Sequence, residues 1–580
     1  KKLNDYFEKE FNELVNRKPQ LQTSLGIKKD YDKWNDISPK EYQYDLNQTK
    51  KSLLWLKDSV DINFLDKSSL LSYQLYVKEL EDQIEDQKYR LFGSAPYYKY
   101  PVNQMFGMQS EIPSFLINMH SVSSEKEAID YIARLNGVKP LFNQLEINIK
   151  EKESAGIVAQ KFVYEHVLND SRNIISGYPF SMSSVDSSAL FKDIFMKVNS
   201  LDIGQEIKDD LINDATQALN ESVKPAYESL ISLISELSNN YDQEDGVWRW
   251  ENGEVFYNYI LKRTTTTNLS ADEIHQIGLR EVDRIHNEMI KIMNLVGFSG
   301  TLKDFFNELK ESDDFYYPQT LEGEKAYMAE AKNIIDQMEL RLDELFITKP
   351  KAQMIVKAVE DFREKSAGKA FYQRPAPDGS RPGTYYANLY NMRAMPKYEM
   401  EALAYHEGIP GHHMQIAIAQ ELQNIPKFRK FGGYTSYIEG WGLYSEYLPK
   451  ELGFYSDPYS DFGRLSMELW RSCRLVVDTG IHSKKWTRED GIRYYSENTP
   501  NDISDCIKMV ERHIVMPSQA TAYKIGMDKI LQLRLKAKES LGDNFDIREF
   551  HDTILSNGAL PLNFLELEID EMIKRIQTGL

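Results

Sequence analysis

The sequence predicts a mainly α-helical protein with two lobes and a small β-hairpin or sheet. Apolar residues recur at three- or four-residue intervals along most of the 580 residues, which is typical of helices that bury one face. One stretch, 370–390, breaks this pattern with dense Pro and Gly between aromatic runs. No strongly biased linker separates independent domains. We therefore expect a single unit over 1–580, with approximate lobes at 1–262 and 263–580.

The clearest helix is predicted at 270–296. Ser270 and Glu273 have the spacing of a capping box, and apolar residues follow at helical intervals. His275 and His286 lie on this segment, and we expect them to be ordinary helix residues. The same periodicity predicts helix in further segments: 53–87, 129–151, 203–238, 324–345, 398–423, 436–448, 465–484 and 507–541.

The main departure from helix is 370–390, "AFYQRPAPDGSRPGTYYANLY". Pro and Gly at this density break helices, while the flanking Phe and Tyr residues favour strands. We therefore expect a hairpin or small sheet here. Two weak linker candidates, 238–246 and 263–270, are too short and too little biased to separate domains.

Composition excludes several classes of function. With 89 acidic against 70 basic residues, the formal net charge is -19, so a polyanion such as DNA is repelled and nucleic-acid binding is not expected. The sequence contains no run of about 18 uncharged apolar residues, so no transmembrane segment is predicted. The two cysteines, Cys473 and Cys506, are too few for a disulfide framework or a Cys-based zinc site, and whether they pair is left open.

Histidines gather in one segment, "YHEGIPGHHMQ" at 405–415. Three of the ten histidines in the chain lie within 406–413, and Glu407 directly follows the first of them. One interpretation is ordinary surface polarity on a helix. The other is a metal site, because imidazole is the commonest metal ligand and zinc peptidases place their general base directly after the first ligand. We favour the metal site.

The spacing of these histidines is incompatible with an unbroken helix. Position +6 lies about 120° around and about 9 Å along a helix from His406, so His412 would not share an ion with it. Pro410, with a glycine on each side of the Ile-Pro pair, breaks the helix and allows a bulge. Such a bulge returns His412 to the place of a +4 histidine. We favour His412 over His413 as the ligand. His413 would then support the site, face the substrate or simply pack in the fold.

A third ligand is expected from the next predicted helix. Glu439 lies 27 residues after His412, which suits a helix, a turn and an antiparallel return. Glu446 is the second candidate, more consistent with a supporting or surface role. Together His406, His412 and Glu439 predict a site for one Zn²⁺, with water in the open position and Glu407 as general base. This set implies metal-assisted hydrolysis.

Several long motifs resemble one bacterial family. They are "AYHEGIPGHHMQ", "YIEGWGLYSE", "DGSRPGTYYANL", "CRLVVDTGIHSKKW", "PSQATAYKIG", "YPVNQMFGMQSEIPSFL" and "LSADEIHQIGLREVDRI". The family they resemble is the one labelled domain of unknown function 885, and the likeness covers almost the whole chain. Its members look like zinc metallopeptidases related to mostly helical oligopeptidases and carboxypeptidases with a deep channel, and some resemble secreted or lipoprotein forms. The resemblance implies a helical, clefted peptidase.

Further residues are candidates for roles beside the metal. Arg474, Asp478 and His482 share one helical face, either as an intrahelical ion-pair ladder or with His482 or Arg474 binding the substrate carboxylate or the oxyanion. Tyr523 is the candidate oxyanion donor, with a core tyrosine as the competing interpretation. A strand edge that binds an extended peptide is expected from three residues of the predicted sheet: Tyr385, Tyr386 and Asn388.

The sequence thus predicts a zinc-dependent peptidase that hydrolyses short peptides with metal-activated water. The alternatives are a zinc hydrolase of non-peptide amides or esters, and an inactive relative that binds peptides. The chain begins Lys1-Lys2-Leu3 without an initiator Met, so we expect a processed protein, with a lipid anchor on a removed N-terminus as one option. A periplasmic or outer-membrane lipoprotein is favoured over a cytoplasmic protein. Substrate preference and oligomeric state are not predicted.

Overall fold

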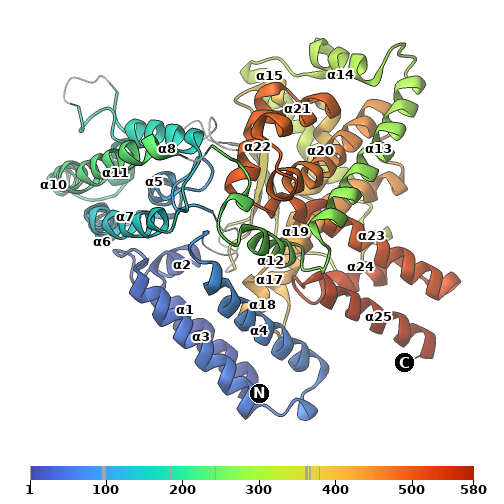
Figure 1. Cartoon of the computed structure of the whole chain (residues 1–580), viewed down its shortest axis with the longest axis horizontal. Coiled ribbons are helices and arrows are strands. Elements are labelled where there is room, and N and C mark those ends of the chain that lie inside the picture. Colours follow the sequence, from blue (N-terminus) through green and yellow to red (C-terminus); the bar gives the residue numbers. More distant parts are fainter. Residues whose placement is uncertain are drawn as a thin grey trace. The chain divides into compact units, whose positions relative to one another are not determined.

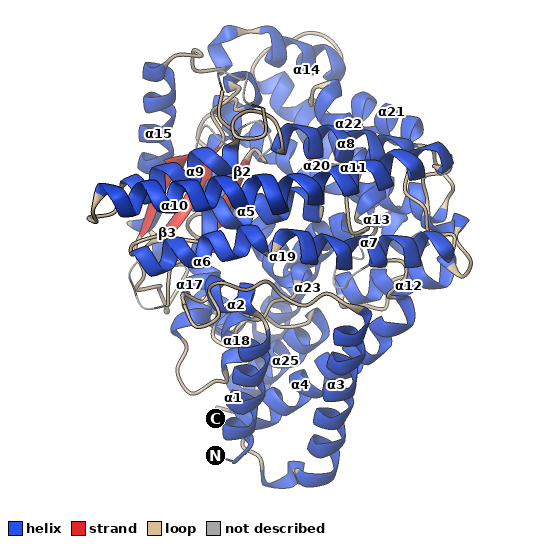
Figure 2. Cartoon of the chain, turned by 90° about the vertical axis from the view of Figure 1, so that its left-hand side faces the viewer, coloured by secondary structure: helices blue, strands red, loops and turns tan. Residues whose placement is uncertain are grey.

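A computed structural model describes residues 2–93, 99–181, 186–241, 243–359, 364, 368–377, 379 and 381–579. The chain divides into two compact units, Lys1–Asp245 and Gly246–Leu580 (Figure 1). Helices dominate both units, and a small sheet lies in the second (Figure 2). These observations confirm the mainly α fold class with a small sheet.

The division between the units falls at the end of the predicted linker candidate 238–246 rather than at 262/263. Helix α12 (Gly253–Thr265) explains the difference, because it packs against α19 (Thr435–Tyr447), α20 (Pro458–Ser483) and α23 (Ala522–Leu541). Its residues Phe256, Ile260 and Leu261 are buried there. This helix is therefore part of the second unit.

The first unit is a set of packed helices in which α11 lies against α7 and α8, and α10 lies against α6 and α9. Its helices are α1 (Lys2–Arg17), α2 (Pro19–Ser24), α3 (Pro39–Ser59), α4 (Lys67–Asp86), α5 (Met108–Met119), α6 (Glu125–Asn136), α7 (Val138–Ser154), α8 (Lys161–Ile174), α9 (Ala189–Asn199), α10 (Gln205–Ala218) and α11 (Lys224–Leu237). The predicted segment 129–151 is divided at Gly137, where an added Cβ would lie 2.9 Å from the Trp34 ring.

The second unit is built around two long contacts, α13 with α20 and α19 with α23. Its other helices surround these pairs and position the histidine segment. The helices not yet given are α13 (Ala271–Leu295), α14 (Leu302–Glu311), α15 (Leu321–Glu339), α16 (Met400–Glu407), α17 (His412–Glu421), α18 (Lys427–Phe431), α21 (Arg488–Asn498), α22 (Ile503–Val515), α24 (Ile547–Leu555) and α25 (Leu562–Thr578).

Helix α13 begins where the sequence predicts. The capping box between Ser270 and Glu273 is formed. His275 and His286 are ordinary helix residues, as expected: the first bonds the Thr479 hydroxyl at 2.8 Å and the second the Asn498 carbonyl at 2.8 Å. These contacts tie α13 to the elements packed against it.

The sheet has three strands in the order β1-β3-β2: β1 (Met354–Ala358), β2 (Ala370–Gln373) and β3 (Gly383–Ala387). Strands β2 and β3 pair antiparallel, which confirms the predicted hairpin. The sequence did not predict β1, which pairs parallel with β3. Two positions of the Pro- and Gly-rich loop, 378 and 380, lie outside the described residues.

Two further sequence expectations concern membrane spans and thiols. Within the described ranges, no helix has the length and apolarity to cross a membrane. Cys473 and Cys506 are both buried free thiols. Burial raises the pKa of the Cys506 thiol to about 11, so the thiolate form is disfavoured.

Candidate metal centre

The histidine segment is a broken helix. Helix α16 ends at Glu407 and α17 begins at His412, with Gly408 to Gly411 between them. A Cβ added to Gly411 would lie 2.0 Å from the His406 carbonyl oxygen, so only glycine allows the chain to pass this close to the end of α16. The Trp441 indole on α19 donates a hydrogen bond of 2.9 Å to the Pro410 carbonyl, which fixes the break against the neighbouring helix.

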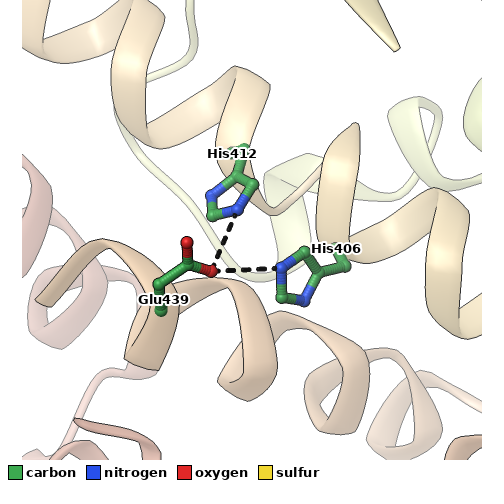
Figure 3. A group of neighbouring side chains, drawn as sticks. All are labelled: His406, His412 and Glu439. Carbon is green, nitrogen blue, oxygen red and sulfur yellow. Dashed lines mark ion pairs between the residues drawn. The ribbon is translucent and has the colours of Figure 1, made fainter. Parts of the chain in front are cut away.

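This break brings His406 and His412 together. Their ring centroids lie 4.6 Å apart, and one ligand atom from each of His406, His412 and Glu439 lies within 4.8 Å of the others. Both imidazoles face the same carboxylate (Figure 3): the Glu439 Oε2 atom is 3.6 Å from His406 Nε2 and 3.5 Å from His412 Nε2. The three residues predicted as ligands therefore converge from α16, α17 and α19.

The donor atoms fit a tetrahedral divalent metal. Two ligands bound at about 2.0–2.1 Å to a tetrahedral zinc lie about 3.3–3.4 Å from each other. The separations of 3.5 and 3.6 Å between nitrogen and oxygen are near this value and longer than normal hydrogen bonds. Two imidazoles and one carboxylate are also a donor set of catalytic zinc sites, which leave a position open.

A carboxylate behind His406 orients its ring. The His406 Nδ1–H donates a hydrogen bond of 2.7 Å to Glu446 Oε1, which leaves the Nε2 lone pair directed at Glu439. Glu446 is almost completely buried, and Arg471 Nη2 lies 3.5 Å from the same oxygen. Of the two roles weighed for Glu446, the supporting role fits this geometry.

Charges around the histidines favour a cation at this position. Burial acts to lower the pKa of His406, but Glu439 and Glu446 outweigh it and raise the pKa to about 10. Burial likewise acts to raise the pKa of Glu439, and the two imidazoles instead hold it well below its usual value. The two carboxylates thus stabilise positive charge between the rings.

Glu407 lies beside the triad in a buried environment, with 7% of its surface exposed. Burial raises the pKa of its carboxyl group, against the opposing effect of His406 and His412. A carboxylate whose proton affinity is increased in this way is suited to accept a proton from water. The position directly after the first histidine is thus occupied by a buried carboxyl group of raised pKa.

Space for the two imidazoles comes from a glycine that the sequence analysis did not single out. A Cβ added to Gly442 on α19 would lie 2.8 Å from His406 Cε1 and 3.1 Å from His412 Cε1. Its signal is visible in "YIEGWGLYSE", because a glycine inside a helix costs about 0.5–1 kcal/mol relative to alanine and so marks a close approach.

The next histidine, His413, is directed away from the triad. Its Nδ1 bonds the Tyr372 hydroxyl at 2.8 Å, and its Nε2–H donates to the Ala352 carbonyl at 3.0 Å. Burial lowers the pKa of His413 to about 4, so the ring is neutral. His413 therefore connects α17 to the sheet, and the structure gives it no contact with the predicted ligands.

His482 requires a correction, since we predicted a catalytic role for it. Its Nδ1 accepts a hydrogen bond from the Val247 N–H at 3.2 Å, and its Nε2–H donates to the His513 carbonyl at 2.9 Å. Both ring nitrogens are thus used by the backbone. Asp478, on the same face, is not part of an intrahelical ladder either, because it bonds His513 Nδ1 at 2.9 Å and the Tyr257 hydroxyl at 2.7 Å.

The predicted peptide-binding strand also requires a correction. Strand β3 is the middle strand, so both of its edges are already paired and neither is free for a peptide backbone. Tyr386 stacks on Phe371 with ring centroids 4.9 Å apart, and the Asn388 side chain donates to the Glu364 carbonyl at 2.7 Å. Only Tyr385 lies near the triad: burial raises its pKa well above the ordinary value, and the charge of Glu407 adds to this effect.

Arg474 and Tyr523 lie against each other. The Arg474 guanidinium carbon is 4.6 Å from the centroid of the Tyr523 ring, a cation–π arrangement between α20 and α23. Tyr523 is 9% exposed, and its hydroxyl has no hydrogen-bond partner among the residues that the structure describes. Sequence reasoning missed Arg471, although it lies one helical turn before Arg474 and shares its face.

Comparison with known proteins places the chain in a family. A search of curated proteins gave no match. A solved structure of a protein described as a "putative lipoprotein" from Colwellia psychrerythraea is 31% identical, with a TM-score of 0.93 and 99% of each chain covered. A second, described as a "putative lipoprotein of unknown function" from Shewanella oneidensis, is 16% identical, with a TM-score of 0.74 over 97% of this chain and 98% of that chain, and shows the fold alone. Residues 19–569 match the family described as "Bacterial protein of unknown function (DUF885)", so the chain belongs to that family.

Proposed function

We propose that the protein is a zinc-dependent peptidase that hydrolyses short peptides. The observation that carries this proposal is the convergence of His406, His412 and Glu439 with their ligand atoms within 4.8 Å, directly beside the buried Glu407. Three ligands with one open position are typical of catalytic rather than structural zinc sites. The bonded pair of His406 and Glu446 supports the same conclusion, because ligating histidines usually donate their second N–H to a carboxylate.

Each residue of this site has a defined part in peptide hydrolysis. His406, His412 and Glu439 would hold a zinc ion, which would lower the pKa of a bound water and polarise the substrate carbonyl. Glu407 accepts the proton of the attacking water and then delivers it to the leaving amine. Glu446 holds the His406 ring in the orientation that presents Nε2. Tyr523, whose hydroxyl is unpaired among the described residues, is our candidate donor to the oxyanion.

The test combines metal content with turnover. The purified protein, before and after chelation, is analysed for bound metals and incubated with a mixed peptide library whose products are identified by mass spectrometry. We expect about one zinc per chain, cleavage that disappears on chelation and returns with zinc, and a Glu407→Gln variant that keeps the metal but loses at least about 100-fold in rate. The control is Glu421→Gln. The native Glu421 carboxylate accepts hydrogen bonds from the Lys351 and Ala352 N–H groups.

Three other outcomes separate the alternatives. A protein that binds no transition metal contradicts the zinc proposal. Zinc binding together with hydrolysis of amides or esters, but not of peptides, identifies a non-peptide hydrolase. Zinc binding with peptide affinity and no turnover identifies an inactive peptide-binding relative.

A location outside the cytoplasm, with a lipid anchor at a processed N-terminus, is also proposed. Its support is the description of the 31% identical structure from Colwellia psychrerythraea as a lipoprotein. Fractionation of cells that express the full-length gene, followed by mass analysis of the mature N-terminus, tests it. An unmodified cytoplasmic protein contradicts it.

A further inference from the structure

Arg474 is a buried cation without a counter-ion. Its residue surface is 5% exposed, and two of its guanidinium nitrogens, Nε and Nη1, are buried without a hydrogen-bond partner. No ion pair or hydrogen bond joins it to any residue that the structure describes. Burying a charge without a partner is costly, and arginine in proteins almost always finds an acceptor. The cation–π contact with Tyr523 only partly offsets this cost.

Two further arginines increase the positive charge at this place. Burial lowers the pKa of Arg474 to about 10, and the neighbouring charges of Arg512 and Arg471 add to this effect. Arg512 bonds the Gln519 side chain at 2.8 Å and has a buried Nε without a partner. Arg471 donates a hydrogen bond of 3.1 Å to the Met467 carbonyl, and its counter-ion among the described residues is the shared Glu446 carboxylate, 3.5 Å away. Like charges this close repel each other, so an anion placed among them would be strongly bound.

The arginine cluster and the candidate metal centre lie on different helices that pack against each other. Arg471 lies one turn before Arg474 on α20 and approaches Glu446, which in turn bonds His406. Tyr523 belongs to α23, which packs closely against α19, the helix of Glu439: a Cβ on Gly440 would lie 2.5 Å from the Gly526 Cα atom. A ligand held at Arg474 and Tyr523 is therefore bound by helices that pack against two helices of the triad, α20 against α16 and α23 against α19.

We propose that Arg474, with Arg512 beside it, binds the free carboxylate at the C-terminus of the peptide substrate. This inference rests on the proposed peptidase function and gives it a substrate class: peptides with an unblocked C-terminus. A carboxylate fits because guanidinium groups donate strong charge-assisted hydrogen bonds to it, and Arg474 has unused N–H donors at Nε and Nη1. The C-terminal carboxylate is the one anion that every unblocked short peptide carries.

Matched peptides test the proposal without any change to the protein. Each peptide is prepared as the free acid and as the C-terminal amide, with and without an internal Glu, so that a side-chain carboxylate is distinguished from the terminal one. We expect the free acids to be cleaved with a kcat/KM at least about 100-fold higher than the amides, independent of the internal Glu. Equal cleavage of acids and amides overturns the inference and leaves the proposed peptidase function intact.

An Arg474→Gln variant assigns the preference to this residue. We expect the ratio of its kcat/KM values for free acids and for amides to fall from at least about 100 to about 1. A merely structural role would instead lower both rates together. Zinc content and melting temperature are measured alongside, and Arg493→Gln, an exposed arginine on α21, serves as control. A preference that survives in Arg474→Gln overturns the assignment.

If no peptide is cleaved, the proposed function is contradicted, and the carboxylate site is tested by measuring binding instead. Calorimetry on the zinc-loaded protein then compares a free-acid tripeptide, its amide and inorganic phosphate. Binding of the free acid that is lost in Arg474→Gln supports the carboxylate site on its own. Binding of phosphate without the free acid, or of neither, overturns it.

Discussion

At the residue scale, two adjacent histidines have opposite environments. His412 presents Nε2 to Glu439 at 3.5 Å, whereas His413 uses both ring nitrogens to bind Tyr372 and the Ala352 carbonyl. Successive residues at the start of a helix project about 100° apart, so only one of the two faces the Glu439 carboxylate. The assignment of His412 rather than His413 as the ligand can therefore be tested by the zinc content of variants at each position.

Replacing each histidine in turn gives contrasting results. We expect His412→Ala to lose stoichiometric zinc with little change in thermal stability of the apo protein. His413→Ala should keep zinc but lower the free energy of unfolding by roughly 1–3 kcal/mol, because the Tyr372 hydroxyl and the Ala352 carbonyl lose a buried partner. Metal analysis and denaturant titration measure both quantities. Zinc loss in His413→Ala alone would reverse the assignment.

Sequence patterns predicted some of these residues and not others. His406, His412 and Glu439 were predictable because ligand chemistry, a helix break and a helical return restrict which residues meet. His482 looked equally polar, but its role depends on backbone groups of Val247 and His513 that lie far away in the sequence. Such contacts are determined by packing, which periodicity does not encode.

At the element scale, the interruption between α16 and α17 is the essential feature. The sequence predicted a break because Pro410 cannot continue a helix and the glycines permit unusual backbone conformations. It did not predict strand β1, since five residues without a flanking turn signal look like any short apolar run. The position of β3 between two partners likewise follows only from the assembled sheet.

The break is tested by adding a methyl group to it. In Gly411→Ala the new Cβ would meet the His406 and Tyr405 carbonyl oxygens at 2.0 and 2.3 Å, and backbone atoms cannot rotate away. We expect a loss of about 1–3 kcal/mol in the free energy of unfolding and a weaker affinity for zinc, because His406 must shift. Gly368→Ala, where the nearest atom is 3.9 Å away, is the control. Unchanged zinc affinity in Gly411→Ala would show that the break tolerates displacement.

At the scale of the whole molecule, both units contain buried neutral histidines. Burial lowers the pKa of His120 to about 3, of His482 to about 4 and of His551 to about 3. Below a pH of about 6.5, these groups bind protons when the chain unfolds but not when it is folded. Folding stability therefore falls as the pH decreases from about 6.5 toward 4. Asp528, whose pKa burial raises to about 6, contributes with the opposite sign.

Melting temperatures recorded between pH 7.5 and 4.5 test this dependence. We expect a progressive decrease below pH 6.5, to which each buried histidine contributes about 1.4 kcal/mol per pH unit. His551→Gln should melt lower than the wild type at pH 7.5 but show a shallower dependence on pH. An identical slope in His551→Gln would contradict the assignment to buried histidines.

The broken helix has an electrostatic consequence as well as a geometric one. A continuous helix through 400–421 would have no end near the histidines, whereas the interruption creates two ends. The carbonyl end of α16, with its partial negative charge, lies at His406, where it favours a bound cation by about 0.3–1 kcal/mol. The amide end of α17, with its partial positive charge, begins at His412 and favours negative charge close to it. The four-residue break thereby places helix ends of opposite partial charge on the two sides of the candidate metal centre.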